Sequence, residues 1–498
     1  MNSESTESEI ESRQREILPF REKFFYGLGD AGFNIVNAAL SFYLTYFLIN
    51  VGGLEAKLAS IVLLVAKFFD VFACFFMGII ADKTEVKRFG NRRVYMIFVS
   101  LPFGLSFILL WLTPVQGDSQ ALRIVYYIFA YIIYVTFYEI GYIPYNAISA
   151  NMTSDYDERT SINGYRIVLA NIGILVGAAV FAVLADGPDS VFAHTFGKLR
   201  TAYLVTSCIY AVVTAVIIFL SGYMVKERVD AREKRTKSLL LTLKEFVHLK
   251  ELRNVAIWYI TSLAGFDIIM GYYMFYINDC LKFGGGTMAM VLIAIPLVAA
   301  IASAAGWVYF SEKFAKESVY IVASLWMFVG LLIAVFIPEK CLWAIIIAAA
   351  FVGAGMSAIQ ILPYAAVPDV VDVDEYTYGE RREALYYGIL QLLYKLLSGI
   401  TTSVCTAIIG AFGYKESNDG SIRDQPKRAL WAVRIIFGIG PSVFFCAAIL
   451  PAFRGRISRE KIEAIKEELS NRKENSDINA LSDQTSRRID QDDNSTFN

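Results

Sequence analysis

Residues 143–166 read IPYNAISANMTSDYDERTSINGYR, and residues 362–388 repeat the pattern as LPYAAVPDVVDVDEYTYGERREALYYG. In each stretch a Pro-Tyr pair ends an apolar run, and an aspartate (Asp155 or Asp374) follows eleven residues after the proline. Glutamate and arginine then precede the next apolar run in both places. The repetition indicates that the chain consists of two halves with related folds.

The composition explains what the repeated unit is. Of the 498 residues, 56% are hydrophobic and only 19% are charged, less charge than a soluble protein of this length carries. The apolar residues fall in blocks of roughly 20 to 28 residues, the length that crosses about 30 Å of hydrocarbon as a helix. Backbone polar groups find no water in that layer, so each block must satisfy its own hydrogen bonds. We therefore predict an all-α polytopic membrane protein with twelve transmembrane helices in two six-helix halves.

A basic segment separates the two halves. Lys and Arg are concentrated in this segment, in the loop after the second span and in the tail after Pro451, and such segments remain in the cytoplasm. An even number of spans then places both termini in the cytoplasm of a multi-pass cell-membrane protein, in the inner membrane if the organism is bacterial. The expected organisation is a cytoplasmic tail at 1–23, a six-helix bundle at 24–225, a cytoplasmic linker at 226–252, a second six-helix bundle at 253–453 and a largely disordered cytoplasmic tail at 454–498.

Charge and motif content exclude several classes of function. The net charge of −1 indicates no nucleic-acid partner. Six cysteines stand singly and two histidines lie far apart, so we expect no disulfide framework, metal site or cofactor. The HExxH, Gly-x-Ser-x-Gly and phosphate-loop motifs of common enzymes are absent from the sequence. Two related helical halves instead favour a monomeric alternating-access transporter over an enzyme.

Polar residues inside the spans mark the candidate site. A charge at the centre of a bilayer costs roughly 2.5–3.5 kcal/mol on insertion scales, so such residues pair with one another or line a wet cavity. A polar stripe on one helical face borders either a cavity or a neighbouring helix to which it hydrogen-bonds. The first span has such a stripe, formed by Asp30, Asn34, Asn37, Ser41 and Thr45.

The fourth span has tyrosines at helical spacing, among them Tyr138 and Tyr142, beside Glu139. Tyrosine offers a ring for stacking and a hydroxyl for hydrogen bonds, which suits a sugar or an amphiphile. The same stripe can instead pack against neighbouring helices. Glu139 favours a cavity.

The eleventh span contains Lys395, which needs a carboxylate partner inside the membrane. Asp70, Glu139 and Asp30 are the candidates. In the second span Lys67 and Asp70 stand three residues apart, so these two can also neutralise each other.

Several motifs together resemble the glycoside–pentoside–hexuronide:cation symporters of the major facilitator superfamily, whose reference member is the melibiose permease. They are YGLGDAGFN at 26–34, Asp70 followed by MGIIADKTEVKRFGNRR at 77–93, and the two stretches at 143–166 and 362–388. The resemblance extends over both halves. It implies a major facilitator-type fold of two six-helix bundles and cation-coupled solute transport.

The resemblance also implies a cation site, and this chain departs from it. Asp70 matches the first aspartate of the family's site in the second span, whereas Cys74 replaces the second aspartate. Na⁺ prefers several oxygen ligands, so Asp70 would need Glu139, hydroxyls or carbonyls to complete a shell. A proton needs only one buried carboxylate. We therefore favour H⁺ over Na⁺ as the coupling ion, with Na⁺ as the alternative.

The sugar site is altered too. Asn34 and Tyr142 stand where the melibiose permease has its two sugar-binding aspartates, and Asn146 stands where it has a tryptophan. Arg166 and Lys395 match the family's charged residues in the fifth and eleventh spans. The scaffold and part of the charge network are thus retained, while galactoside specificity is not supported.

The sequence therefore predicts a secondary active transporter that carries a sugar, glycoside or related small organic solute together with H⁺ or Na⁺. A lysophospholipid or another amphiphile is the alternative solute, and a receptor or scaffold that does not transport is the alternative of another class. The expected partners are the solute, the cation and the lipid bilayer.

The candidate residues fall into three groups. We predict cation coupling by Asp70, Glu139 and Cys74. We predict solute binding by Asp30, Asn34, Asn37, Tyr138, Tyr142, Asn146, Arg166, Asp267, Gln391 and Lys395. We predict gating of the cytoplasmic side by Asp82, Lys83, Arg92, Arg93, Arg159, Asp369, Asp372 and Arg381.

Overall fold

The structure is a computed structural model, and every regular element among its described residues is helical. It describes residues 18–84, 90–113, 119–153, 156–187, 189–228, 250–283, 285–378, 383–417, 424–455, 464–465 and 467–468.

Among the described residues, the first half contains six long helical segments, two of which are interrupted by a short π-helical turn. Their bounds are α2 Phe20–Ala39, η1 Leu40–Leu44, α3 Thr45–Asn50, α4 Ala56–Lys83, α5 Arg93–Trp111, α6 Gln120–Met152, α7 Tyr156–Leu175, η2 Val176–Val180, α8 Phe181–Ala185, the short α9 Val191–Phe196, and α10 Leu199–Met224.

The second half has the same number of long segments. Their bounds are α12 Lys250–Phe275, η3 Tyr276–Cys280, α13 Gly286–Lys313, α14 Lys316–Phe336, α15 Leu342–Tyr378, α16 Glu383–Ala411 and α17 Lys427–Arg454. Helix α2 thus begins within the predicted tail, and α12 begins within the predicted linker.

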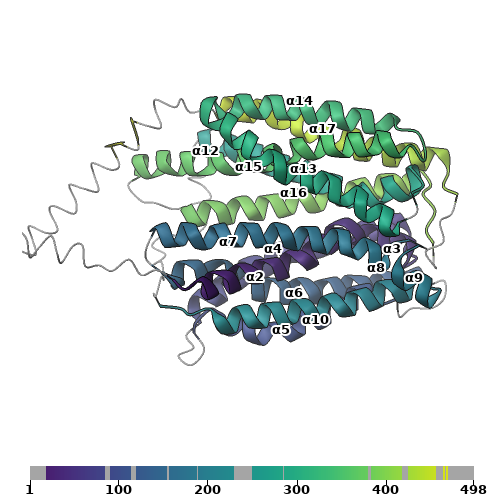
Figure 1. The fold of residues 1–498 in the computed structure, drawn as a ribbon, viewed down its shortest axis with the longest axis horizontal. Helices are drawn as coiled ribbons and strands as arrows, with labels where there is room; N and C mark the ends of the chain where they lie inside the picture. Colours follow the sequence, from purple (N-terminus) through teal and green to yellow (C-terminus); the bar gives the residue numbers. More distant parts are fainter. Residues whose placement is uncertain are drawn as a thin grey trace, which may run out of the picture.

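Twelve of the described helical segments are long and apolar enough to cross a membrane. They run roughly side by side, with α2 to α10 in one bundle and α12 to α17 in the other (Figure 1). Within the bundles α2 packs on α7 and α12 packs on α17, and between them α4 packs on α16. The predicted fold class, two six-helix halves of an all-α membrane protein, is confirmed.

The bundle has an apolar exterior. Large apolar side chains within the helices are more than half exposed, for example Phe72, Phe129, Val212 and Ile301. A water-soluble protein does not expose so much contiguous apolar surface. The surface instead suits the hydrocarbon of a bilayer, where helices with satisfied backbones are stable.

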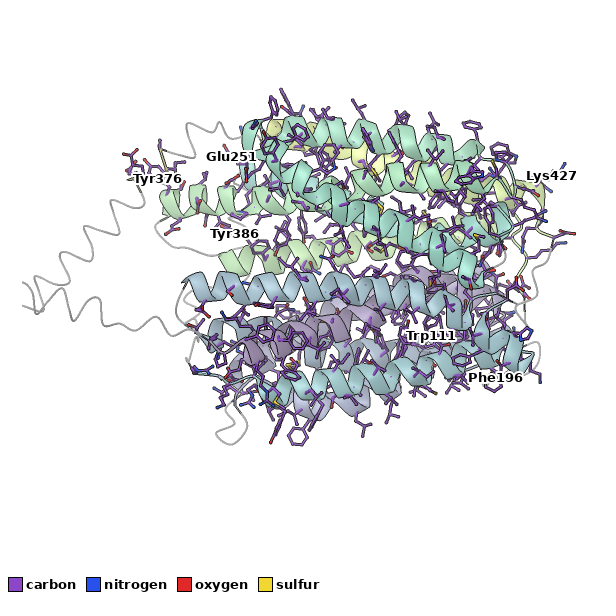
Figure 2. The ribbon with its side chains drawn as sticks, in the orientation of Figure 1. Trp111, Phe196, Glu251, Tyr376, Tyr386 and Lys427 are labelled. Carbon is purple, nitrogen blue, oxygen red and sulfur yellow. The ribbon has the colours of Figure 1, made fainter. Side chains whose placement is uncertain are left out.

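The two ends of the bundle differ. The tail end contains the start of α2 and α12 and the end of α15, and Glu251, Tyr376 and Tyr386 mark it in Figure 2. The opposite end, called the far end below, contains Phe196 and Lys427. The start of α2 and the end of α17 both lie at the tail end (Figure 1).

Small residues bring α2 and α7 into close contact. A Cβ atom on Gly173 would lie 2.6 Å from the carbonyl oxygen of Ala31, and one on Gly177 would lie 2.2 Å from that of Ile35. The spacing of four residues puts both glycines on one face of the helix, which lets two backbones approach as in other membrane helix pairs. The contact holds the polar stripe of α2 beside Arg166 of α7.

Candidate functional site

Three charged side chains from three helices meet where the two halves touch. The Lys395 ammonium on α16 lies 3.0 Å from Asp70 Oδ1 on α4 and 2.5 Å from Glu139 Oε1 on α6. All three residues are buried, and Glu139 is completely inaccessible. Lys395 belongs to the second half, whereas both carboxylates belong to the first. The cluster is called the Lys395 triad below.

The Lys395 triad contains two carboxylates and one ammonium. If all three groups are ionised, the cluster has one net negative charge in a buried place, of which the nearby Lys67 ammonium on α4 offsets a part. A further cation that joins the cluster is therefore favoured. Glu139 Oε2 has no hydrogen-bond partner in the described part of the chain. The Cys74 thiol, one helical turn after Asp70, lies beside Glu139 and adds no charge to the cluster. Glu139 thus brings the second carboxylate that the second span lacks.

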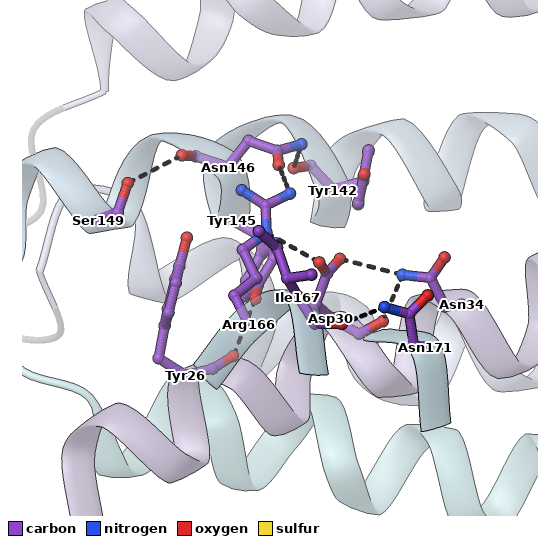
Figure 3. A network of polar contacts seen from close by, with 10 residues as sticks. All are labelled: Tyr26, Asp30, Asn34, Tyr142, Tyr145, Asn146, Ser149, Arg166, Ile167 and Asn171. Atoms are coloured by element: carbon purple, nitrogen blue, oxygen red, sulfur yellow. Dashed lines mark hydrogen bonds and ion pairs between the residues drawn. The ribbon is translucent and has the colours of Figure 1, made fainter. Parts of the chain in front are cut away.

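A second cluster lies inside the first half, nearer the tail end. Arg166 Nε on α7 lies 2.8 Å from Asp30 Oδ2 on α2, and its Nη2 donates to the side-chain oxygen of Asn146 on α6 (Figure 3). Asn34 Nδ2 donates to Asp30 Oδ1 at 3.2 Å. The Arg166 guanidinium also lies over the Tyr145 ring, 5.4 Å from its centre. One arginine and one aspartate leave this cluster neutral.

The tyrosines of α6 combine both roles that the sequence left open. Tyr138 and Tyr142 stack with ring centres 5.0 Å apart, and the Tyr145 hydroxyl donates to the Tyr26 carbonyl of α2. The ring stack lies within α6, whereas the hydrogen bond joins α6 to α2. Tyr138 also lines the cavity described next.

A polar cavity of about 270 Å³ lies between the halves. Seven long segments contribute to its wall: the first span, α4, α6, α7, α12, α15 and α16. Its polar lining consists of Asn37, Ser41, Thr45, Lys67, Asp70, Tyr131, Tyr134, Tyr138, Asp267, Gln360, Tyr394, Ser398 and Thr402.

The predicted solute-binding residues do not all lie in one place. Asn37, Tyr138 and Asp267 line the cavity, together with Asp70. Lys395 belongs to the triad instead. Gln391, Tyr142 and the members of the cluster around Arg166 are not among the lining residues. The structure therefore separates the cavity from the arginine cluster, although both contain residues of the same stripe on the first span.

The Asp267 carboxylate on α12 is held from within the second half. Tyr394 donates a hydrogen bond to its Oδ2 at 2.8 Å, and the Ser398 hydroxyl donates to the same oxygen. Two further residues of the wall, Gln360 and Lys67, were not predicted as site residues. Gln360 lies on α15 within an otherwise apolar run. A polar side chain inside an apolar span was the available signal for both.

Several predicted gating residues make contacts within one half. The Arg93 side chain donates to the carbonyls of Gly222 and Tyr223 at the end of α10, 2.9 and 2.8 Å away. Lys316 pairs with Asp369 at 2.5 Å, and both belong to the second half. The backbone N–H of Arg92 donates to Glu227. Asp372 is buried on α15.

The remaining gating predictions fall where side chains are not described. Asp82 and Lys83 end α4 and Arg159 lies in α7, but their side chains lie outside the described structure. Arg381 lies outside the described residues altogether.

Contacts at the far end join the two halves directly. Asn50 Nδ2 lies 2.9 Å from the Tyr414 hydroxyl, which is also 2.5 Å from Asp279 Oδ2. Asn278 Nδ2 donates to both oxygens of Asp186, at 3.4 and 3.2 Å. Asn50 and Asp186 belong to the first half and the other three residues to the second. This end is therefore closed by buried hydrogen bonds, which the sequence analysis did not foresee.

Two helical bundles around a polar cavity with charged walls define a membrane transporter of the alternating-access type. Residues 25–459 match the family model described as MFS/sugar transport protein, and the chain belongs to this family. The predicted relation to the melibiose permease-like symporters agrees with it. The protein is a multi-pass transporter and not an enzyme.

Curated relatives match nearly the whole chain. An uncharacterized symporter of Synechocystis sp. is 25% identical, covering 94% of this chain and 100% of that protein. An uncharacterized symporter of Bacillus subtilis is 26% identical, covering 91% and 95%. The sodium-dependent lysophosphatidylcholine symporter 1-B of Danio rerio is also 26% identical, covering 91% and 90%.

Solved structures share the fold. The nucleoside transporter NupG (D323A mutant) aligns with a TM-score of 0.62 at 12% identity, covering 87% of this chain and 99% of that one. A D-xylose-proton symporter aligns with a TM-score of 0.62 at 13% identity, covering 88% and 97%.

Proposed function

We propose that the protein is a symporter that moves a small organic solute together with H⁺ or Na⁺ by alternating access. The observation that supports this best is the Lys395 triad, with two buried carboxylates on one ammonium. A cation that joins the triad cancels its net negative charge. Without that cation the buried triad keeps its net charge, which costs free energy. This cost couples cation binding to the conformation of the protein.

The triad bridges the halves, so its charge state bears on how they move. Lys395 holds carboxylates of the other half, and rocking of one half against the other must stretch these contacts. When a proton or Na⁺ neutralises one carboxylate, the attraction that holds Lys395 falls. Cation binding thereby lowers the barrier to rocking while the solute occupies the cavity next to Asp70.

We propose a proton as the coupling ion. Glu139 Oε2 is buried without a hydrogen-bond partner among the described residues, so it can accept a proton without losing an existing bond. Cys74 offers no charge for a Na⁺ shell. The alternative is Na⁺, because the Danio rerio relative is a sodium-dependent symporter by name.

The solute that the polar cavity favours is a sugar, glycoside or related polyol. Hydroxyls and amides such as Asn37, Ser41 and Gln360 can exchange hydrogen bonds with such a molecule. A second candidate, an amphiphile, is favoured by an apolar pocket that shares Met270 with the polar cavity and is lined by Phe42, Tyr273 and neighbours on α13 and α15. There the polar cavity would hold the head group and the apolar pocket part of the tail.

The proposed topology has both termini in the cytoplasm, with residues 1–23, 226–252 and 454–498 on that side. The far end then faces outward and is closed in this conformation. The predicted gating residues are proposed to form the cytoplasmic gate in the opposite conformation, and the protein is proposed to act as a monomer.

The test is uptake by proteoliposomes containing the purified full-length chain. Labelled lactose, glucuronide and lysophosphatidylcholine are offered with an inward proton gradient, an inward Na⁺ gradient, or neither. Uptake driven by the proton gradient at constant Na⁺ supports proton symport. Uptake that responds only to the Na⁺ gradient identifies Na⁺ as the coupling ion in place of the proton. Equilibration of the solute that does not depend on any gradient would refute symport.

A further inference from the structure

A groove lies on the outside of the second half, between α16 and α17. It has a volume of about 350 Å³ and shares no lining residue with the polar cavity. Helix α17 packs mainly on α12 and α14, and α16 packs mainly on α4 and α12. The two helices therefore touch each other little, and the space between them opens to the surroundings of the bundle.

The sides and the floor of the groove are apolar. Ala432 and Ile436 of α17 are buried and form its floor, whereas Phe412 and Trp431 at its sides are about half exposed. Ile435 follows Trp431 after one helical turn, so both stand on the face of α17 that borders the groove. An apolar surface of this shape suits an acyl chain of the bilayer.

Two basic residues stand at one end of the groove. Lys427 and Arg428 begin α17 at the far end, where Figure 2 labels Lys427. Both are exposed, and neither side chain forms an ion pair with a described residue, the nearby Asp424 included. With a rise of 1.5 Å per residue, Ile435 lies about 10 Å deeper in the span than Arg428. The groove is thus cationic at the boundary of the span and apolar toward its middle.

This polarity matches a phospholipid, whose head group lies at the membrane surface and whose tails enter the hydrocarbon. Two cations favour a head group with a net negative charge, since a zwitterionic head group brings a cation of its own. We propose that the groove binds a bilayer phospholipid with an anionic head group, whose phosphate contacts Lys427 and Arg428 while an acyl chain lies against Trp431. This lipid is not the transported solute, so the inference does not depend on the proposed function.

Native mass spectrometry of the purified full-length protein tests this with two lipids that have the same acyl chains. Phosphatidylglycerol is compared with phosphatidylcholine, and glycerol 3-phosphate serves as an anion without tails. We expect the first phosphatidylglycerol molecule to bind about tenfold or more tightly than the first phosphatidylcholine, because two basic side chains lie beside its head group. Glycerol 3-phosphate should bind far more weakly than phosphatidylglycerol. Equal affinities in either comparison overturn the inference.

Paired substitutions locate the preference. Lys427→Gln together with Arg428→Gln should remove the preference for phosphatidylglycerol. Lys198→Gln together with Lys340→Gln takes the same charge from exposed positions at the far end outside the groove, and should leave the preference unchanged. A preference that persists in the first pair, or that both pairs abolish, contradicts a site at this groove.

A third pair separates the tail from the head group. Phe412→Ala together with Trp431→Ala should weaken the binding of both lipids and change the ratio of their affinities little, because it removes apolar surface and no charge. The half-exposed positions make unfolding of this variant unexpected, and its melting temperature checks that. The same spectra report the oligomeric state. A dimer that this pair alone dissociates would assign the groove to a second copy of the chain and overturn the inference.

Discussion

At the scale of single residues, charge count separates the two clusters. The cluster around Arg166 pairs one cation with one anion, whereas the Lys395 triad pairs one cation with two. A neutral pair has no need of a further ion. The triad does, and this difference is the reason for placing coupling at Asp70 and Glu139.

Asp70→Asn should uncouple transport from the cation. The substitution leaves Lys395 with Glu139 as a neutral pair, so no further positive charge is needed. We expect solute exchange across proteoliposome membranes to continue while concentrative uptake falls about tenfold or more, as removal of more than 1.4 kcal/mol of coupling predicts. Lys57→Gln, which removes a charge from an exposed position of the same helix, is the control. Concentrative uptake at the normal level in Asp70→Asn would rule out a coupling role.

Arg166→Lys tests whether the geometry of the arginine matters beyond its charge. Lysine lacks the planar fork that contacts Asp30 and Asn146 together, and it stacks less well on Tyr145. We expect the initial rate of uptake to fall several-fold at equal protein level, with little change in thermal stability. Arg166→Gln removes the charge as well, so its comparison with Arg166→Lys separates the effect of the charge from that of the guanidinium shape. Equal initial rates of uptake in wild type and Arg166→Lys would argue against a role for the fork.

At the scale of elements, helical periodicity predicted much and tertiary contact decided the rest. The stripe of Asp30, Asn34 and Asn37 does lie along one helix, as its spacing indicated. Its members nevertheless have different surroundings, because the helix passes from the arginine cluster to the cavity within two turns. Periodicity shows which residues share a face, but the neighbour of each turn depends on how the helices cross.

The close packing of α2 against the span formed by α7, η2 and α8 depends on Gly177 of η2. Its hypothetical Cβ would overlap the Ile35 backbone, so a larger side chain must push the helices apart. We expect Gly177→Leu to lower the melting temperature of the detergent-solubilised protein clearly, since overpacking costs about 1–3 kcal/mol. Gly164→Leu is the matched control, because nothing lies within 4 Å of a Cβ at that place on the same helix. Similar melting temperatures for the two variants would contradict the close approach.

At the scale of the whole molecule, the far end holds the halves together through buried polar groups. Asp186 lies in the loop after α8, completely inaccessible, and accepts hydrogen bonds from Asn278 and from the Tyr203 hydroxyl at 3.1 Å. Burial raises the pKa of Asp186 to about 6 from 3.8, while these two hydrogen bonds act in the opposite direction. The closed end therefore prefers the protonated carboxyl.

The closed form should therefore gain stability in acid. The pKa of Asp186 is higher in the folded protein than in the unfolded chain, so its contribution is present below about pH 4 and is lost as the pH rises through about 6. We expect the melting temperature to increase between pH 7 and pH 5, with a contribution from Asp186 of at most roughly 3 kcal/mol. Asp186→Asn should make this pH dependence smaller. An unchanged slope in that variant would assign the effect to other groups.

The sequence by itself determined the twelve membrane helices, the division into two halves and some of the polar residues that line the cavity, among them Asn37, Tyr138 and Asp267. Hydrocarbon thickness and the need for satisfied backbone hydrogen bonds act on local sequence, so local sequence is enough to predict them. It also limited the partner of Lys395 to three carboxylates.

Only the tertiary structure decided which of these groups meet. Asp70 and Glu139 contact Lys395, while Asp30 contacts Arg166. Lys67 is left facing the cavity, and Asp186 seals the far end with Asn278. Each of these contacts joins helices distant in the chain. Which residues pair depends on how the helices cross and on how the two halves are placed against each other. Neither can be deduced from the spacing of residues along a single span.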